Sequence, residues 1–127
     1  MASLTALRAV VISITAAFGA PAAAQSGDAA AGERSFRQCA ACHSVEPGQN
    51  RAGPHLHGIV GRQAGAVERF RYSRAMREAD IVWDAAALAA YLTDPRGYLP
   101  GTSKTFRLRR AEQVPDLLAY LKTLRDE

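Results

Sequence analysis

The two cysteines of the chain, Cys39 and Cys42, are separated by two alanines, and His43 follows the second cysteine directly. A C-x-x-C-H element of this kind has three chemical uses: a redox dithiol or disulfide, part of a structural zinc site, or covalent attachment of a haem. Each use makes a different demand on the rest of the sequence.

Attachment of a haem is the use that the rest of the chain favours. A thioredoxin-like dithiol needs a βαβ pattern, which we do not find, and it leaves His43 without a role. A zinc site needs further ligands, but His55 and His57 do not form a second paired cluster. In haem attachment both thiols add to the vinyl groups, and His43 becomes an axial ligand of the iron.

The elements that must position this motif read as helices. Asp28 is a suitable N-cap for a helix over 28–42, whose apolar stripe leads to the cysteines. Residues 45–65 are rich in glycine and lack periodicity, which predicts an ordered loop region. After this loop we expect three further helices: from Ser73 to Ala79, from Asp84 to Pro95, and from Arg110 onward with Pro115 in its first turn. The fold class is therefore all-α, with long loops.

The first 24 residues have the pattern of a secretory signal peptide. Arg8 is their only charged residue, an apolar stretch covers 9–18, and small residues precede the expected cleavage after Ala24. An uncleaved membrane anchor is the alternative, but this stretch falls well short of the ~20 apolar residues of a membrane-spanning helix. We expect a cleaved signal over 1–24, a bacterial periplasmic location, and one soluble domain over 25–127.

The charge balance of the chain argues against nucleic-acid binding. Its 16 Lys and Arg residues exceed its 12 Asp and Glu residues by only four, and the two signs are interspersed. A domain of about 100 residues also builds only a marginal core, so a large apolar cofactor would help it to fold.

Over the whole expected domain the sequence resembles the class I cytochromes c, the family of mitochondrial cytochrome c and bacterial cytochrome c2. Beyond C-x-x-C-H, the resemblance is carried in order by Gly53-Pro54-His55-Leu56-His57-Gly58, Gly61-Arg62, Tyr72-Ser73, Trp83, Tyr91-Leu92, Pro100-Gly101-Thr102, Phe106 and Asp116-Leu117-Leu118-Ala119-Tyr120-Leu121. It implies a fold of about four to five helices around one covalently bound haem c. It also implies a one-electron carrier rather than an enzyme.

The resemblance assigns roles to individual residues. His43 is the proximal iron ligand, and the Pro54 carbonyl accepts a hydrogen bond from its other ring nitrogen, which fixes the tautomer. Donors are needed around the buried haem propionates because a buried carboxylate is otherwise costly. The matching residues are Arg62, Tyr72, Trp83 and Thr102, and Tyr91, Lys104 and Phe106 complete the cofactor-binding set.

The chain departs from the family at the second axial ligand. Relatives carry Pro-Gly-Thr-Lys-Met-x-Phe, whereas this chain has Lys104 in place of that methionine. Met76 is the only methionine in the expected domain. It lies in the short helix before Trp83, where the family fold implies a position away from the iron. We therefore expect no methionine ligand.

Three possibilities remain for the sixth position: the amine of Lys104, water or an open site, and a histidine. A histidine is disfavoured because His55 and His57 lie on the loop that supports the proximal side. An ammonium cannot bind iron, and removing its proton at pH 7 costs about 5 kcal/mol from a pKa near 10.4. Burial lowers this cost, so we favour Lys104. A hard amine prefers ferric iron, which predicts a low reduction potential.

The sequence thus predicts a periplasmic electron carrier, with a haem-based sensor or small-ligand binder as the alternative if the sixth site is open or labile. A peroxidase is disfavoured because the chain offers no distal histidine or acid/base pair. We expect a monomer whose redox partners present an acidic docking surface. The arginines that would steer such a partner are Arg51, Arg74, Arg77, Arg96, Arg107, Arg109 and Arg110.

Overall fold

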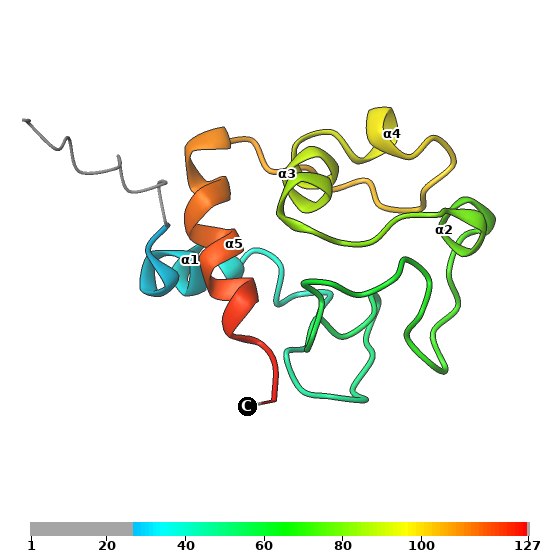
Figure 1. The fold of residues 1–127 in the computed structure, drawn as a ribbon, viewed down its shortest axis with the longest axis horizontal. Helices are drawn as coiled ribbons and strands as arrows, with labels where there is room; N and C mark the ends of the chain where they lie inside the picture. Colours follow the sequence, from blue (N-terminus) through cyan, green and yellow to red (C-terminus); the bar gives the residue numbers. More distant parts are fainter. Residues whose placement is uncertain (1–26, 127) are drawn as a thin grey trace, which may run out of the picture.

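The computed structural model describes residues 27–126, so the expected signal peptide at 1–24 lies outside the described residues. Within this range the chain forms five α-helices and a 3-10 turn, and no β-strand. They are α1 (Ala29–Phe36), α2 (Arg74–Glu78), α3 (Ala85–Thr93), α4 (Pro95–Tyr98), a 3-10 turn (Ala111–Gln113) and α5 (Val114–Thr123) (Figure 1). The predicted all-α class is confirmed.

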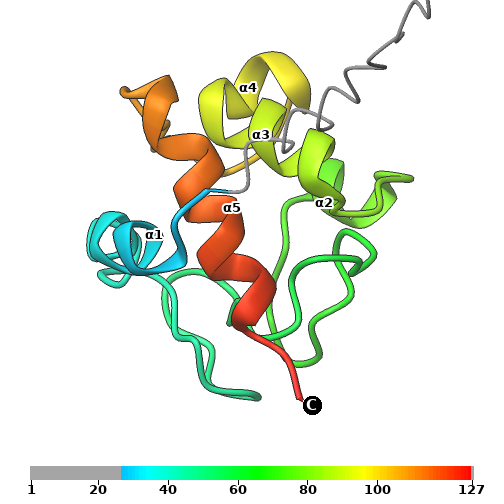
Figure 2. The same cartoon turned by 60° about the vertical axis from the view of Figure 1, so that its left-hand side comes forward.

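Helices α1 and α5, from opposite ends of the described chain, pack across each other (Figures 1 and 2). Gly32 permits this close approach, because a Cβ atom at that position would collide with the backbone carbonyl of Asp116. The rings of Phe36 and Tyr120 meet at the crossing, with their centroids 5.4 Å apart. The backbone N–H of Asp28 also donates to the Asp116 carboxylate over 2.8 Å, which joins the start of α1 to the first turn of α5.

The first helix ends earlier than the predicted Cys42. After Phe36 the chain tightens into turns of the i to i+3 type, such as the hydrogen bond of 2.7 Å from the Cys39 N–H to the Phe36 carbonyl. A second turn follows, in which the N–H of His43 donates to the carbonyl of Cys39 over 3.0 Å. The motif therefore lies on a tight turn after α1 rather than on a regular helix.

Three of the predicted helix starts are confirmed by their caps. Asp28, Ser73 and Asp84 each accept a hydrogen bond from a backbone N–H in the first turn of the helix that follows. Pro95 does not simply end α3: Asp94 caps a further helix, α4, in which Pro95 takes the first position. The last helix begins with a 3-10 turn after Arg110 and becomes α-helical at Val114.

The long segment between α1 and α2 is an ordered loop region, as predicted, and is fastened to its neighbours by backbone hydrogen bonds. Gly61 donates to the carbonyl of Trp83, and Trp83 donates in turn to the carbonyl of Arg62, both over 2.8 Å. The segment after α4 is tied down where Leu108 donates to the carbonyl of Leu92 over 2.7 Å. Among the described residues, no helix is both long and apolar enough to cross a membrane.

Candidate cofactor site

A cavity of about 340 Å³ opens between the loops, α3 and α5, and its wall is largely apolar. Leu56, Ile59, Leu88, Leu92 and Leu121 supply much of this apolar surface. All the residues predicted to bind a cofactor line this one cavity: Cys39, Cys42, His43, Pro54, Arg62, Tyr72, Trp83, Tyr91, Thr102, Lys104 and Phe106. The structure therefore brings together residues that are spread over most of the domain.

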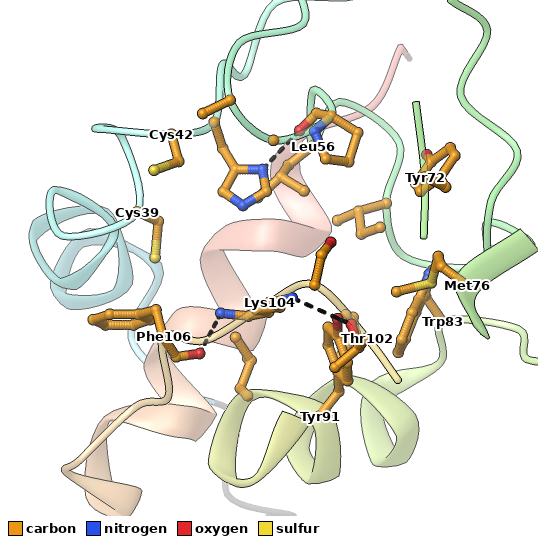
Figure 3. Close-up of a pocket in the computed structure, with 18 of the residues that line it drawn as sticks. Cys39, Cys42, Leu56, Tyr72, Met76, Trp83, Tyr91, Thr102, Lys104 and Phe106 are labelled. Atoms are coloured by element: carbon orange, nitrogen blue, oxygen red, sulfur yellow. Dashed lines mark hydrogen bonds between the residues drawn. The ribbon is translucent and has the colours of Figure 1, made fainter. Parts of the chain in front are cut away.

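The sulfur atoms of Cys39 and Cys42 lie along one side of this cavity (Figure 3). Both are free thiols, so the pair does not form a disulfide. Burial raises the pKa of Cys39, and the nearby charge of Lys104 partly opposes this effect. In the part of the chain that the structure describes, no group of three or more His, Cys, Asp and Glu side chains could hold a metal ion.

The imidazole of His43 is held by the loop that follows the motif. Its Nδ1 lies 2.7 Å from the carbonyl oxygen of Pro54, which is the contact that the family resemblance implied. Gly53 packs so closely on the ring that an added Cβ atom would collide with it. Burial lowers the pKa of His43, while the bond to Pro54 opposes this effect. A neutral ring that donates from Nδ1 keeps the lone pair of Nε2 for a metal.

Lys104 enters the same cavity from the segment after α4. Its side chain is half-buried, its Nζ donates to the backbone carbonyl of Phe106 over 2.6 Å, and it lies 4.9 Å from the centroid of the Phe106 ring. Burial lowers the pKa of Lys104, which favours the neutral amine. The turn that carries Lys104 is supported from α3, because the Tyr91 hydroxyl lies 2.6 Å from the Thr102 hydroxyl.

Arg62 and Tyr72 are fixed by backbone contacts at another side of the cavity. Arg62 donates to the carbonyl of His55 over 2.9 Å and also to the carbonyl of His57. The Tyr72 hydroxyl accepts a hydrogen bond of 3.1 Å from the N–H of Val67. Burial lowers the pKa of Arg62, so a bound anion would stabilise its charged form. This is the chemistry that a carboxylate of a cofactor would find here.

Met76 is still predicted to lie away from the iron, but it belongs to the same cavity as the expected haem ligands. Its side chain is buried and lines the cavity, on the side of Tyr72 and Trp83, whereas Lys104 lies on a separate segment (Figure 3). Phe70 also lines the cavity and packs edge-on against Tyr72, with ring centroids 4.8 Å apart. Neither residue belongs to a sequence motif, and α2 is too short for its periodicity to show a buried face.

The family model described as cytochrome c matches residues 29–125. The chain belongs to this family. Cytochrome c2 of Blastochloris viridis is 46% identical over 111 residues, which cover 86% of each chain. Cytochrome c of Nigella damascena is 41% identical over 102 residues, covering 78% of this chain and 92% of the relative. Among solved structures, cytochrome cH from Methylobacterium extorquens has a TM-score of 0.72 at 42% identity, covering 76% of this chain and 99% of that one.

Members of the cytochrome c family are electron carriers with a c-type haem attached through two cysteines, which are Cys39 and Cys42 in this chain. The cavity fits that group in its chemistry. It has an apolar wall for the porphyrin, two free thiols on one side, and an imidazole whose Nδ1 is already engaged by the protein. This cytochrome is therefore a haem-based electron carrier.

Proposed function

We propose that this cytochrome is a periplasmic one-electron carrier of low potential, with His43 as the proximal and Lys104 as the distal iron ligand. The observation that carries the proposal is the position of Lys104 in the wall of the cavity that also contains His43. The remaining members of the cofactor-binding set, from Pro54 to Phe106, would hold the haem and its carboxylates.

The haem, when bound, supplies the one-electron iron couple. The chain supplies a fixed imidazole at His43, through the Pro54 carbonyl, and an amine at Lys104. Burial of Lys104 against the apolar wall lowers the cost of keeping its amine neutral. Ligation requires the lysine proton to leave, so it is linked to pH.

Ultraviolet-visible and paramagnetic resonance spectra of the purified holoprotein test the two ligands. We expect low-spin ferric haem in the natural protein and a marked spectral change in Lys104→Ala, because the amine is lost. Lys122→Ala, at the exposed lysine of α5, is the matched control and should leave the spectra unchanged. Identical spectra for Lys104→Ala and the natural protein would contradict lysine ligation.

The location and the partners follow from the same proposal. A signal peptide over 1–24 exports the domain at 25–127 to the periplasm, where it acts as a soluble monomer. Two of the similar proteins are cytochromes c2 of bacteria, from Blastochloris viridis and Afifella marina, which supports a bacterial setting. The exposed arginines favour redox partners with acidic docking surfaces.

A second candidate function is the binding of a small ligand at the iron. It is favoured by the hydrogen bond from Lys104 to the Phe106 carbonyl. An amine held by this bond would not bind the iron, so the sixth position would be open to a ligand. Rapid binding of carbon monoxide to the ferrous protein at neutral pH would support this function. Slow binding, limited by loss of Lys104, would support the carrier.

A further inference from the structure

The imidazole of His55 lies against Arg62, a residue of the cavity wall. The guanidinium of Arg62 donates from Nη1 to the backbone carbonyl of His55 over 2.9 Å and from Nη2 to the carbonyl of His57. The same Nη2 lies 3.5 Å from Nδ1 of the His55 ring. Arg62 lines the haem cavity, and His55 is not among the lining residues. The His55 ring is thus linked to the cavity by the side chain of Arg62.

The contact between these two side chains depends on the charge of His55. A neutral imidazole can leave Nδ1 unprotonated, as an acceptor for the Nη2 group of Arg62. A protonated imidazole carries N–H groups on both ring nitrogens, so it cannot accept this hydrogen bond and it repels the guanidinium. Burial lowers the pKa of His55, and the charges of Arg62 and His57 lower it further. The neutral ring is therefore the form that fits this contact.

The groups that act on His55 are cations or can become cations. They are Arg62 and His57. The Nε2 of His57 is in turn 3.2 Å from the Asp126 carboxylate, and Tyr72 is a further titratable group that acts on Arg62. Among residues 27–126, no carboxylate forms an ion pair with His55 or with Arg62. A carboxylate of the haem would therefore be the first counter-charge at this place.

Reduction of the haem changes the electrostatic balance at this place. It adds one negative charge to the group in the cavity that Arg62 lines. A negative charge in a partly buried site stabilises the cations around it, and this offsets part of the repulsion between Arg62 and a protonated His55. The proton affinity of His55 should therefore be higher in the ferrous protein than in the ferric protein.

We propose that His55 is a positioning residue that couples uptake of a proton to reduction of the haem, acting through Arg62. In this step the redox partner supplies one electron to ferric iron, and the solvent supplies one proton to Nδ1 of His55. Oxidation releases both. By linkage, the reduction potential rises as pH falls through the range in which His55 titrates, and it is constant well above and well below that range.

The proposal rests on the haem-based electron carrier of the proposed function, but it holds for any sixth ligand of the iron. It also concerns a group other than Lys104. Protonation of His55 leaves both axial ligands in place, so it should not change the absorption spectrum of the haem.

The reduction potential of the holoprotein, measured from about pH 4 to pH 8, tests the coupling. Potentials are compared only where the ferric absorption spectrum is constant, so that a change of axial ligand does not contribute. We expect about threefold higher proton affinity in the ferrous state. This raises the potential by about 28 mV across the transition, since a tenfold change corresponds to 59 mV for one electron.

Two substitutions of histidine identify the group that titrates. His55→Asn keeps an acceptor, Oδ1, near the place of Nδ1 but cannot be protonated, so we expect the potential to become independent of pH in this range. His57→Asn removes the other histidine of the same loop and should keep the dependence. The natural pH dependence in His55→Asn would overturn the proposal, because a haem carboxylate or another group would then be titrating.

Nuclear magnetic resonance of the His55 ring protons gives a readout that does not use the potential. The pKa of His55 should be higher in the ferrous holoprotein than in the ferric one, by the same factor of about three in proton affinity. Arg62→Gln should remove most of this difference, and Arg62→Lys, which keeps the charge, should restore part of it. Equal values of the His55 pKa in the two oxidation states of the natural protein would overturn the coupling. An undiminished difference in Arg62→Gln would overturn the role of Arg62.

Failure of this proposal is distinguishable from failure of the proposed function. A holoprotein with a Soret band and a reversible redox wave, but a potential that does not change over this pH range, would overturn the role of His55 and leave the electron carrier intact. A holoprotein without a reversible redox wave would contradict the carrier itself.

Discussion

A lysine amine and a methionine thioether differ as iron ligands in hardness, so under the proposed ligation the residue at position 104 would control the reduction potential. The amine stabilises ferric iron and the thioether stabilises ferrous iron. Lys104→Met should therefore raise the reduction potential, on the order of 100 mV or more. A potentiometric titration of both holoproteins measures the difference. Lys122→Met should leave the potential unchanged, and an equal potential in Lys104→Met would argue against the amine as ligand.

The protonation of Lys104 gives the site a dependence on pH. Burial holds the pKa of this lysine below its usual 10.5, and bonding to a metal favours the neutral form further. The folded state therefore binds fewer protons than the unfolded state between the two pKa values, so stability rises with pH in that window. As pH falls through the folded value, the amine is protonated, and under the proposed ligation it would leave the iron.

An acid titration followed by the ferric absorption spectrum measures this release. We expect one reversible transition in the natural protein and its absence in Lys104→Ala. A transition at the same pH in both proteins would assign it to another group.

Some contacts of the site could be predicted from the sequence and others could not. The C-x-x-C-H spacing and the neighbouring Pro54 are local signals with a known geometry, and the His43 to Pro54 contact has the expected partners. Met76 and Phe70 face the same cavity for a different reason, because they are placed by packing between distant segments. No spacing in the sequence encodes such a contact.

At the scale of helices, the sequence was informative where a cap marks the start. Asp28, Ser73 and Asp84 carry this signal in their own side chains. The pair Asp94-Pro95 carries it too, since aspartate is a good N-cap and proline is favoured at the first position. A proline after a helical pattern equally predicts the end of a helix, so this pair is ambiguous in the sequence. The end of α1 could not be predicted as well from the sequence. It depends on the hydrogen bonds of the turns over 37–42, which replace the regular helical pattern.

The crossing of α1 and α5 gives a prediction at this scale. Gly32→Ala places a methyl group against the carbonyl of Asp116, so the helices must separate. Overpacking of this kind costs about 1–3 kcal/mol of unfolding free energy. Denaturant unfolding of the holoprotein measures the cost. Ala30→Val, which adds bulk at an exposed position of α1, should cost only about 0.5 kcal/mol. Equal costs would show that the crossing tolerates the extra atom.

At the scale of the whole molecule, the cofactor takes the place of a larger protein core. The apolar wall of the cavity would face water in a domain without haem. A domain of about 100 residues has only a small free energy of unfolding, so this exposure would matter. Cys39→Ala/Cys42→Ala prevents covalent attachment, so we expect loss of the cooperative unfolding transition. Circular dichroism during heating measures this change. A melting temperature equal to that of the holoprotein would show that the protein core suffices.

The pairing of α1 with α5 also has a consequence for biogenesis. Because α5 is synthesised after all the other described helices, α1 cannot complete its packing until α5 has emerged from the ribosome. The two thiols follow α1 closely in the sequence, so we expect them to stay accessible for haem attachment until α5 has been synthesised. The order in which the segments appear thereby delays burial of the very groups that have to react first.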